Sequence, residues 1–266
     1  MWSVCQILAP RRQNQSERAI TAPLLSARGL AISFGGVVAA SGIDLDVVEG
    51  ENLAIIGPNG AGKTTFLNIC TGYLTPSAGS VRFLGGEITG QSPRVITRLG
   101  IARAFQIPQL FTEHTVLENV MIAAASRARR RNPFQLISAL PERAEMLDLL
   151  RLVGCADIAE RQAGTLPEGS RKLVDIAVAL ALRPRLLLMD EPTAGVASSE
   201  KFAIMDMIVA ALRQQNVTSV FVEHDMEMVT RYADRVAVWT TGKILRAGPP
   251  AEVLADAEVI ATVTGM

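Results

Sequence analysis

The sequence predicts an α/β fold built around a mainly parallel sheet. A short apolar run at 52–56 leads into the glycine-rich segment 57–65, and a helix with an apolar face follows it. Further apolar strands then alternate with helical patterns, which is typical of a parallel sheet covered by helices. Two alternating segments ahead of the glycine-rich segment predict an N-terminal antiparallel β subdomain. A helical stretch at about 92–165 predicts an inserted α-helical subdomain.

The composition is that of a folded chain without a charge bias. The 266 residues are 49% apolar, which suffices for a large core, and 26 basic residues balance 26 acidic ones. Only 5% of the residues are aromatic. A nucleic-acid-binding domain is expected to carry clustered positive charge, and a single-strand binder also needs aromatic stacking surfaces. We therefore expect no nucleic acid partner.

The cysteines and the apolar segments indicate a reduced environment and no membrane span. Cys5, Cys70 and Cys155 are far apart and lack C-x-x-C spacing, so we expect free thiols rather than disulfides or a metal site. The most apolar window, 173–189, contains an aspartate, two arginines and a proline, which argues against a transmembrane helix. We expect no secretory signal, because the apolar stretch 2–10 precedes a basic pair instead of following one.

In chain order, we expect a flexible leader over 1–22, which is polar and irregular, and a single domain over 23–266. Segments 24–34 and 37–48 alternate around Gly35-Gly36 and predict a β-hairpin. The later elements are expected as helices at 116–125 and 143–153, a helix around 173–180, a strand at 186–189, a helix at 202–212, a strand at 218–222 and a hairpin made of 235–239 and 243–247.

The segment 57–65 fits G-x-x-x-x-G-K-[ST] and predicts a loop that binds a nucleoside triphosphate. Phosphate oxygens need several backbone N–H groups at close range, and glycines let the backbone approach without side-chain clashes. The helix that follows adds the positive end of its dipole. We expect Lys63 to reach the β- and γ-phosphates and Thr64 to ligate Mg²⁺. The residues expected to bind the nucleotide are Gly57, Pro58, Asn59, Gly60, Ala61, Gly62, Lys63, Thr64 and Thr65.

A second motif follows the apolar run 186–189, which ends in Asp190 and Glu191. Four apolar residues predict a strand buried on both faces, so the two carboxylates are delivered at its end. Next to a phosphate loop, Asp190 is expected to hold Mg²⁺ together with Thr64. Glu191 is expected to polarise the water that attacks the γ-phosphate.

With both motifs in place, Leu24–Met266 resembles the ATP-binding subunit of an ABC transporter. The resemblance implies a P-loop NTPase core of the RecA-like type, with ATP and Mg²⁺ as cofactors and ATP hydrolysis as the activity. It further implies that Phe34 stacks on adenine and that Gln106 reaches Mg²⁺ or the attacking water. His224, at the family's switch position, is implied to contact the γ-phosphate and to hold Glu191 and the water in register.

The signature loop departs from the family pattern Leu-Ser-Gly-Gly-Gln. Here it is Leu-Pro-Glu-Gly-Ser, and the residues that the resemblance implies at the opposite subunit's ATP are Leu166, Gly169 and Ser170. Pro167 lacks the serine hydroxyl that would donate to the γ-phosphate, a loss of about 1.5–3 kcal/mol for a bond to a charged group. Proline is tolerated at a helix start, and the helix that follows still offers N–H groups and a dipole. We expect a weakened loop that still functions.

The subfamily features resemble the ATPase subunits of branched-chain amino acid, urea and amide importers. The segments that carry this resemblance are Phe34–Gly36, Thr115–Val120, Pro192–Val196 and Gly248–Val253, together with the proline-bearing signature loop. The resemblance implies a second ABC ATPase subunit, membrane permeases and, indirectly, a periplasmic binding protein as partners. It implies a peripheral location at the cytoplasmic face of the inner membrane.

Three alternatives stay open at this point. A soluble ABC ATPase acting in DNA repair or on ribosomes predicts duplicated cassettes, a long coiled coil or a zinc motif, and none is visible. A small-molecule kinase predicts neither a signature loop nor a switch histidine. A catalytically weakened regulatory subunit of an asymmetric pair is suggested by Pro167 and by Ala197, which stands where the family has an aspartate.

Overall fold

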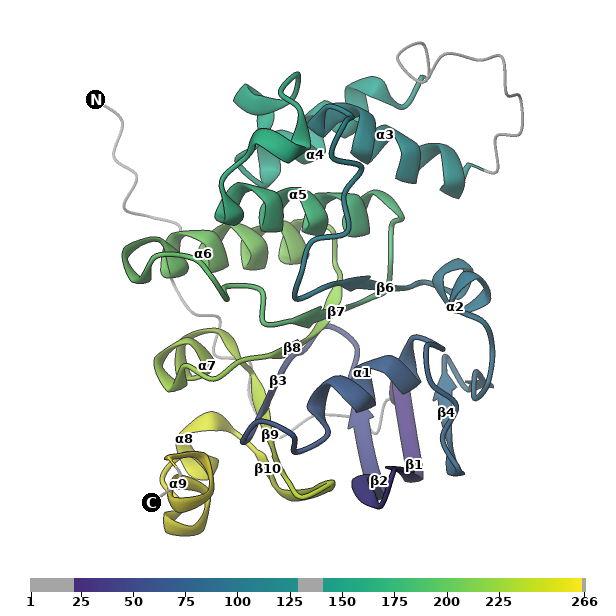
Figure 1. Cartoon of the computed structure of the whole chain (residues 1–266), viewed down its shortest axis with the longest axis vertical. Coiled ribbons are helices and arrows are strands. Elements are labelled where there is room, and N and C mark those ends of the chain that lie inside the picture. The colour runs from purple at the N-terminus through teal and green to yellow at the C-terminus, as the bar shows by residue number, and fades with distance from the viewer. Residues whose placement is uncertain (1–21, 129–140, 265–266) are drawn as a thin grey trace.

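Two β-sheets and a layer of helices make up the chain in the computed structural model, which describes residues 22–128 and 141–264 (Figure 1). This architecture confirms the predicted α/β fold class, with one antiparallel and one mainly parallel sheet. The predicted leader at 1–22 lies outside the described residues except for its last residue. The predicted bounds of the domain and of its helical insertion remain predictions.

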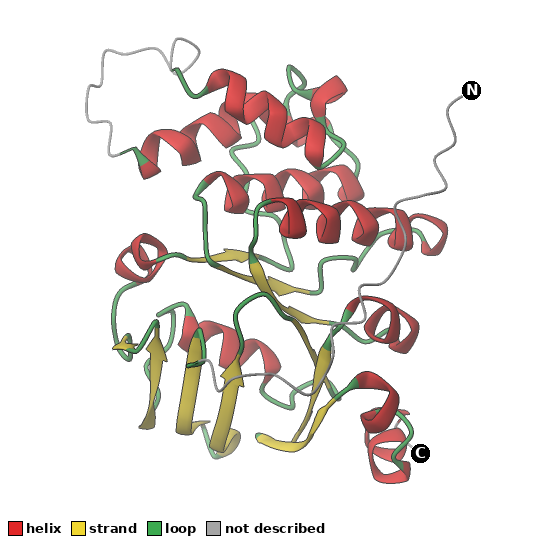
Figure 2. Cartoon of the chain, turned by 180° about the vertical axis from the view of Figure 1, so that it is seen from behind, coloured by secondary structure: helices red, strands yellow, loops and turns green. Residues whose placement is uncertain are grey.

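The first sheet is antiparallel, with strand order β2-β1-β4-β5. Its strands are β1 (Leu25–Phe34), β2 (Val37–Val47), β4 (Ala78–Phe83) and β5 (Gly86–Glu87). β1 and β2 form the predicted hairpin, in which Phe34 pairs with Val37 across the two glycines. Both glycines have positive φ, which is why that turn needs them. Figure 2 shows this sheet below the helical layer.

The second sheet has six strands in the order β10-β9-β3-β8-β7-β6. They are β3 (Asn52–Ile56), β6 (Ile101–Ala104), β7 (Leu186–Asp190), β8 (Thr218–Val222), β9 (Arg235–Thr240) and β10 (Lys243–Gly248). Five strands are parallel, and β10 is added antiparallel at one edge. β6 was not predicted, since only helices were expected over about 92–165. Its sequence Ile-Ala-Arg-Ala has little β propensity, and pairing with β7 decides its conformation.

The helices are α1 (Lys63–Cys70), α2 (Pro93–Leu99), α3 (Val116–Arg127), α4 (Arg143–Leu152), α5 (Glu168–Ala181), α6 (Ser198–Gln214), α7 (Met226–Tyr232), α8 (Pro250–Val253) and α9 (Ala257–Thr264). Two 3₁₀ turns, Ala156–Ile158 and Ala163–Thr165, lie between α4 and α5. A capping box starts α3, because the Thr115 hydroxyl accepts from Glu118 N while the Glu118 carboxylate accepts from Thr115 N. Within residues 22–128 and 141–264, no helix combines the length and the apolar character needed to cross a bilayer.

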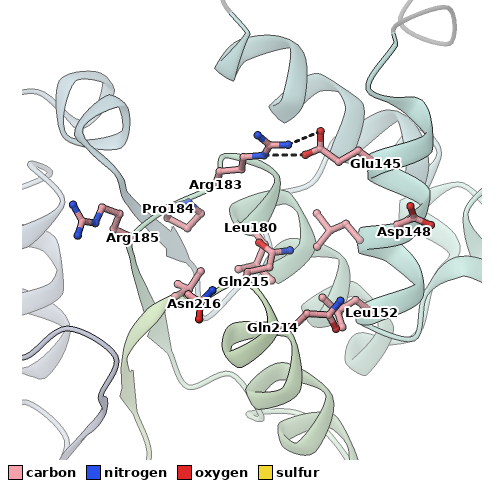
Figure 3. A pocket seen from close by; sticks show the side chains of 12 residues that line it. Glu145, Asp148, Leu152, Leu180, Arg183, Pro184, Arg185, Gln214, Gln215 and Asn216 are labelled. Carbon is pink, nitrogen blue, oxygen red and sulfur yellow. Dashed lines mark hydrogen bonds and ion pairs between the residues drawn. The ribbon is translucent and has the colours of Figure 1, made fainter.

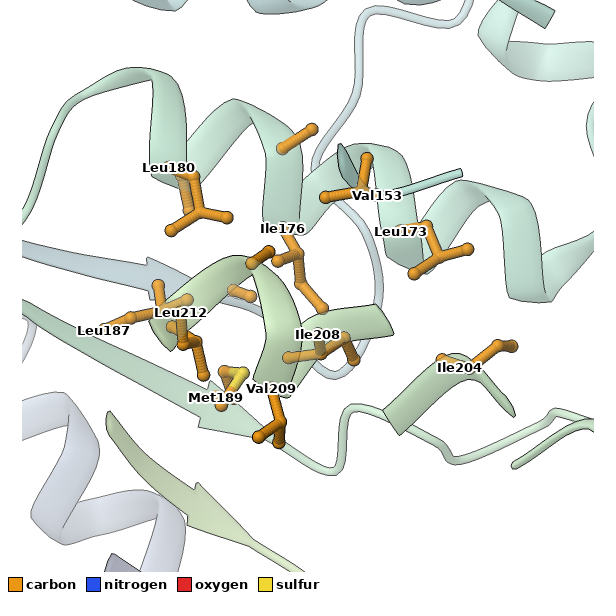
Figure 4. Packing of buried hydrophobic residues seen from close by; sticks show 14 of the residues in the cluster. Val153, Leu173, Ile176, Leu180, Leu187, Met189, Ile204, Ile208, Val209 and Leu212 are labelled. Carbon is orange, nitrogen blue, oxygen red and sulfur yellow. The ribbon is translucent and has the colours of Figure 1, made fainter. Parts of the chain in front are cut away.

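Two hydrophobic cores lie on opposite faces of the six-stranded sheet. One contains the apolar faces of α3, α4, α5 and α6 together with one face of the sheet. Figure 4 shows the part of this core where α5 and α6 pack on β7. The other contains α1, the antiparallel sheet and the opposite face. β3 illustrates the division, because Ala54 and Ile56 belong to the first core whereas Leu53 and Ile55 belong to the second.

A cavity of about 520 Å³ lies beside α4, near the starts of β7 and β8 (Figure 3). At its rim Arg183 Nη2 lies 2.9 Å from the Glu145 carboxylate, and Arg127 Nη1 lies 3.1 Å from the same group. Glu145 thereby ties α4 to α3 and to the connection between α5 and β7. The cavity is at the amino ends of the parallel strands, so it lies away from the predicted site at their carboxyl ends.

Candidate nucleotide-binding and hydrolysis site

The predicted site residues gather where four neighbouring strands end. β3, β8, β7 and β6 are adjacent in the sheet and parallel, so their carboxyl ends lie along one edge. The phosphate loop follows β3, His224 follows β8, Asp190 and Glu191 come at the end of β7, and Gln106 comes two residues after β6. Ligands of open α/β sheets bind at such an edge.

Two glycines of the phosphate loop are required by close backbone contacts. Gly57 has φ of +143°, and a Cβ there would overlap the Trp239 carbonyl oxygen. Gly62, which begins α1 with φ of +101°, would in the same way overlap the carbonyl oxygen of Ala39 in β2. The loop therefore packs closely against both sheets, and a side chain at Gly57 or Gly62 would displace the loop backbone.

Lys63 is buried at the start of α1 and its ammonium points back into the loop. Nζ donates hydrogen bonds to the carbonyl oxygens of Gly57 at 2.6 Å and Pro58 at 2.9 Å. Burial lowers the pKa of Lys63, and the nearby carboxylates of Glu191 and Asp190 act in the opposite direction. The buried ammonium of Lys63 thus lies within the predicted phosphate loop, and its contact with the phosphates stays a prediction.

Asp190 is a buried carboxylate with two different neighbours. Oδ2 lies 2.9 Å from Nη2 of Arg103, and both side chains are almost fully buried. Oδ1 lies 3.4 Å from the Thr64 hydroxyl. Thr64 and Asp190 thus bring two oxygen atoms together, which is the kind of donor that Mg²⁺ prefers when substrate phosphates complete its shell. Among the described residues there is no cluster of three or more His, Cys, Asp or Glu side chains that could form an all-protein metal site.

Glu191 receives hydrogen bonds from two of the predicted catalytic residues. Gln106 Nε2 donates to Oε2 at 2.9 Å, and His224 Nε2 lies 3.1 Å from Oε1. Glu191 also has φ of +52°, a conformation that non-glycine residues rarely adopt and that is often found at functional sites. The structure therefore brings Gln106, Glu191 and His224 together from three different strands.

Three charged residues at this site had no predicted role. Arg103 pairs with Asp190, and Lys172 Nζ donates to the carbonyl oxygens of Gln106 and Glu191. Asp175, also on α5, accepts from the backbone N–H groups of Phe105 and Gln109. Burial raises the pKa of Asp175 to about 6, although both N–H groups favour its charged form. The sequence held one signal for the α5 pair, since two charges three residues apart interrupt an apolar helix.

The remaining predicted residues lie away from this cluster. Phe34 ends β1 with an exposed ring, at the tip of the hairpin. Gly169 and Ser170 lie in the first turn of α5, whose N-cap is Pro167, and Leu166 directly precedes that N-cap. The Leu166 side chain is buried in the core beneath the helices, which leaves only its backbone for a ligand. A Cβ at Gly169 would lie 3.1 Å from Ile204 of α6, so this glycine also serves packing.

Comparison with known proteins places this arrangement in a family. A family model described as ABC transporter matches residues 40–194, more than half of the chain. The chain belongs to the ABC transporter family. It is 36% identical to BraF of Pseudomonas aeruginosa, a high-affinity branched-chain amino acid transport ATP-binding protein, over 91% of this chain and 98% of that relative. It is 33% identical to LivG of Escherichia coli, which carries the same description, over the same shares.

The solved structures agree with this assignment. The ADP conformation of an ATP-binding cassette of an ABC transporter superposes with a TM-score of 0.81 and 32% identity, covering 92% of this chain and all of that one. The chain is thus an ABC-type ATP-binding cassette, the ATP-hydrolysing part of a transport system. The small-molecule kinase considered above is not supported.

Proposed function

We propose that this cassette hydrolyses ATP to drive the uptake of amino acids or related small polar solutes through a membrane permease. The names of its relatives support the substrate class, since they are branched-chain amino acid transport proteins of nearly the same length. The arrangement around Glu191 supports the chemistry, and it is the observation that carries the proposal.

Glu191 is proposed to polarise the water that attacks the γ-phosphate. Gln106 and His224 each donate to one of its carboxylate oxygens when the imidazole carries its proton on Nε2, and this fixes the carboxylate's orientation. Lys63 would exchange its bonds to the loop carbonyls for phosphate oxygens and stabilise the charge that spreads during transfer. Gln106 and His224 already contact Glu191, and Lys63 already contacts the phosphate loop.

Mg²⁺ is proposed as the metal of this site, held by Thr64 and Asp190 with Gln106 in reach. When bound with ATP, it neutralises charge on the phosphates. Arg103 occupies the other oxygen of Asp190, so Oδ1 stays directed toward Thr64. This leaves few protein ligands, which suits an ion that is shared with the nucleotide.

A second ABC ATPase subunit is proposed to cover the ATP. Leu166, Gly169 and Ser170 belong to the helical layer, so their loop is proposed to close over ATP held by the partner subunit, while the partner's loop covers ATP at Lys63. Phe34, exposed at the hairpin tip, is proposed to stack on adenine. Pro167 offers neither a hydroxyl nor an N–H group, so we expect a weaker bond to the γ-phosphate than a serine would give.

A permease is proposed to bind between α2 and α3. A cavity of about 750 Å³ there is lined by apolar residues such as Leu99, Phe111 and Val178 and by five arginines (Arg94, Arg98, Arg127, Arg183 and Arg185), and the exposed apolar side chain of Ile107 lies nearby in sequence. Aromatic and arginine side chains are enriched at protein–protein interfaces. Because 105–109 also carries Gln106, a permease segment seated here would act on the hydrolytic site. This contact would hold the cassette at the cytoplasmic face of the membrane, with a periplasmic binding protein on the other side. The helical insertion at about 92–165 is proposed to move together with the bound permease segment.

The test compares Glu191→Gln with the wild-type chain. The variant should bind ATP with wild-type affinity and lose turnover by about 10³-fold, or roughly 4 kcal/mol of barrier. Light scattering should show an ATP-dependent dimer for the variant if the chain pairs with its own copies. Turnover near the wild-type rate would overturn the assignment of Glu191. Wild-type turnover that appears only with a different co-purified ATPase subunit would instead favour the regulatory role in an asymmetric pair.

A further inference from the structure

Lys172 is a buried ammonium whose two hydrogen bonds both go to catalytic segments. It lies in α5 with 3% of its surface exposed. Nζ donates to the carbonyl oxygen of Gln106 at 2.9 Å and to that of Glu191 at 3.0 Å. Burying an ammonium is costly unless its donors are used. A methionine or leucine would fill the same apolar helix at no such cost, so the charge points to a role beyond packing.

The same helix holds the Gln106 segment by a second charge of opposite sign. Asp175, one turn after Lys172, accepts from Phe105 N at 3.0 Å and from Gln109 N at 3.1 Å. Residues three apart lie on one face of a helix. One face of α5 therefore binds the backbone around Gln106. Lys172 donates to the Gln106 carbonyl, and Asp175 accepts from the N–H groups of Phe105 and Gln109.

The bond to Glu191 acts on a residue in an unfavourable conformation. Glu191 has φ of +52°, and such a backbone persists only where its surroundings hold it. Its N–H donates to Val222 O at 3.2 Å, and its carbonyl accepts from Lys172 Nζ at 3.0 Å and from Ala194 N at 3.1 Å. Lys172 thus supplies one of the three hydrogen bonds that fix the peptide units flanking this residue.

We propose that Lys172 is a positioning residue that sets the Glu191 and Gln106 side chains against each other for hydrolysis. The proposal rests on the proposed role of Glu191. Without the ammonium, the carbonyl oxygens of Gln106 and Glu191 lose the donor that they share. The backbone segments that carry the two side chains are then less fixed, and so is the 2.9 Å contact between Gln106 Nε2 and Glu191 Oε2. Because α5 also begins with the signature loop, movement of that loop would reach the hydrolytic pair through the same side chain.

The experiment measures kcat for ATP and the affinity for nucleotide on the full chain. Lys172→Met removes both hydrogen bonds and keeps the apolar stem, and Lys243→Met makes the same change at an exposed position of β10. We expect Lys172→Met to lower kcat on the order of 10- to 100-fold, the scale of a misplacement of about 1 Å, with less than a roughly twofold change in ATP affinity. Lys243→Met should match the wild type in both.

Combination with Glu191→Gln distinguishes positioning from general damage. If Lys172 acts through Glu191, adding Lys172→Met to Glu191→Gln should change the residual turnover by less than about twofold. An equal loss in both backgrounds would overturn the proposal, as would a kcat near wild type for Lys172→Met. Should Lys172→Met lose ATP binding by misfolding, Lys172→Gln, whose amide stops one atom short of the ammonium, is put through the same comparison with the same two overturning results.

The two proposals fail in different ways. Glu191→Gln with wild-type turnover would refute the proposed function whatever Lys172 does. An inactive Glu191→Gln beside a fully active Lys172→Met would leave the proposed function intact and refute the role of Lys172.

Discussion

Replacing Arg103 with methionine should destabilise the fold itself. The guanidinium lies 2.9 Å from Asp190 Oδ2, and the side chains are 6% and 3% exposed. The guanidinium carbon Cζ of Arg103 also lies 4.9 Å from the centre of the Phe105 ring. Removing one partner of a buried ion pair leaves an uncompensated charge and costs about 3–5 kcal/mol. For a chain of this size, that corresponds to a fall in Tm of about 10 °C.

The assay is denaturant unfolding without nucleotide, on Arg103→Met, Asp190→Asn and the double variant. The double variant lacks both charges of this pair, so its loss of stability should be smaller than the sum of the two single losses by about 2–3 kcal/mol. Arg28→Met is the matched control. It breaks the ion pair with Asp46, where both side chains are about half exposed, and should cost less than about 1 kcal/mol.

Two results would refute this reasoning. One is an Arg103→Met loss no larger than that of Arg28→Met, which would mean that Asp190 is solvated or takes up a proton without cost. The other is strict additivity in the double variant, which would mean that Arg103 and Asp190 do not interact energetically in the folded chain.

Three further predictions concern separate parts of the molecule. Gly62→Ala should abolish ATP binding in a titration, because φ of +101° and the carbonyl of Ala39 exclude a Cβ; wild-type affinity would contradict this. The pKa of Asp175 is raised to about 6 in the folded chain, so the folded state binds this proton more tightly than the unfolded state does. The contribution of Asp175 to stability should therefore fall as pH rises from about 4 to 6. Asp175→Asn should remove that slope from unfolding free energies measured at pH 4.5 and 7, and an unchanged slope would refute it. Thr115→Ala should cost about 1 kcal/mol by loss of the α3 cap, measured against Thr262→Ala, which removes the hydroxyl of a half-buried residue, a group that donates to the Glu258 carbonyl within α9 and caps no helix.

Much of the fold and of the site was predictable because the signals are local. The glycines at 57–65, the apolar run ending in Asp190 and the alternation of β1 and β2 each lie within about a dozen residues. Such patterns depend on backbone sterics and on burial of one face, which a sequence displays directly. The fold class and the family follow from them, and the comparisons confirm both.

The parts that escaped prediction depend on distant pairing. β6 is a strand because β7 lies beside it, 85 positions further along the chain by the pair Ile101 and Leu186. Arg103 faces Asp190 only through that pairing. Lys172 and Asp175 were visible as charges in an apolar helix, yet nothing local told which backbone groups they would meet.

The strand order also decides when the nucleotide site forms as the chain is made. β3 precedes the phosphate loop, but its two neighbours in the sheet, β8 and β9, come from Thr218–Val222 and Arg235–Thr240. The antiparallel hairpin of β1 and β2 can pair as soon as it leaves the ribosome, since its contacts are local. The backbone N–H and C=O groups on both edges of β3 stay unpaired until β8 and β9 have been synthesised. A chain truncated before β8 would therefore present an apolar strand prone to aggregation instead of a site for ATP.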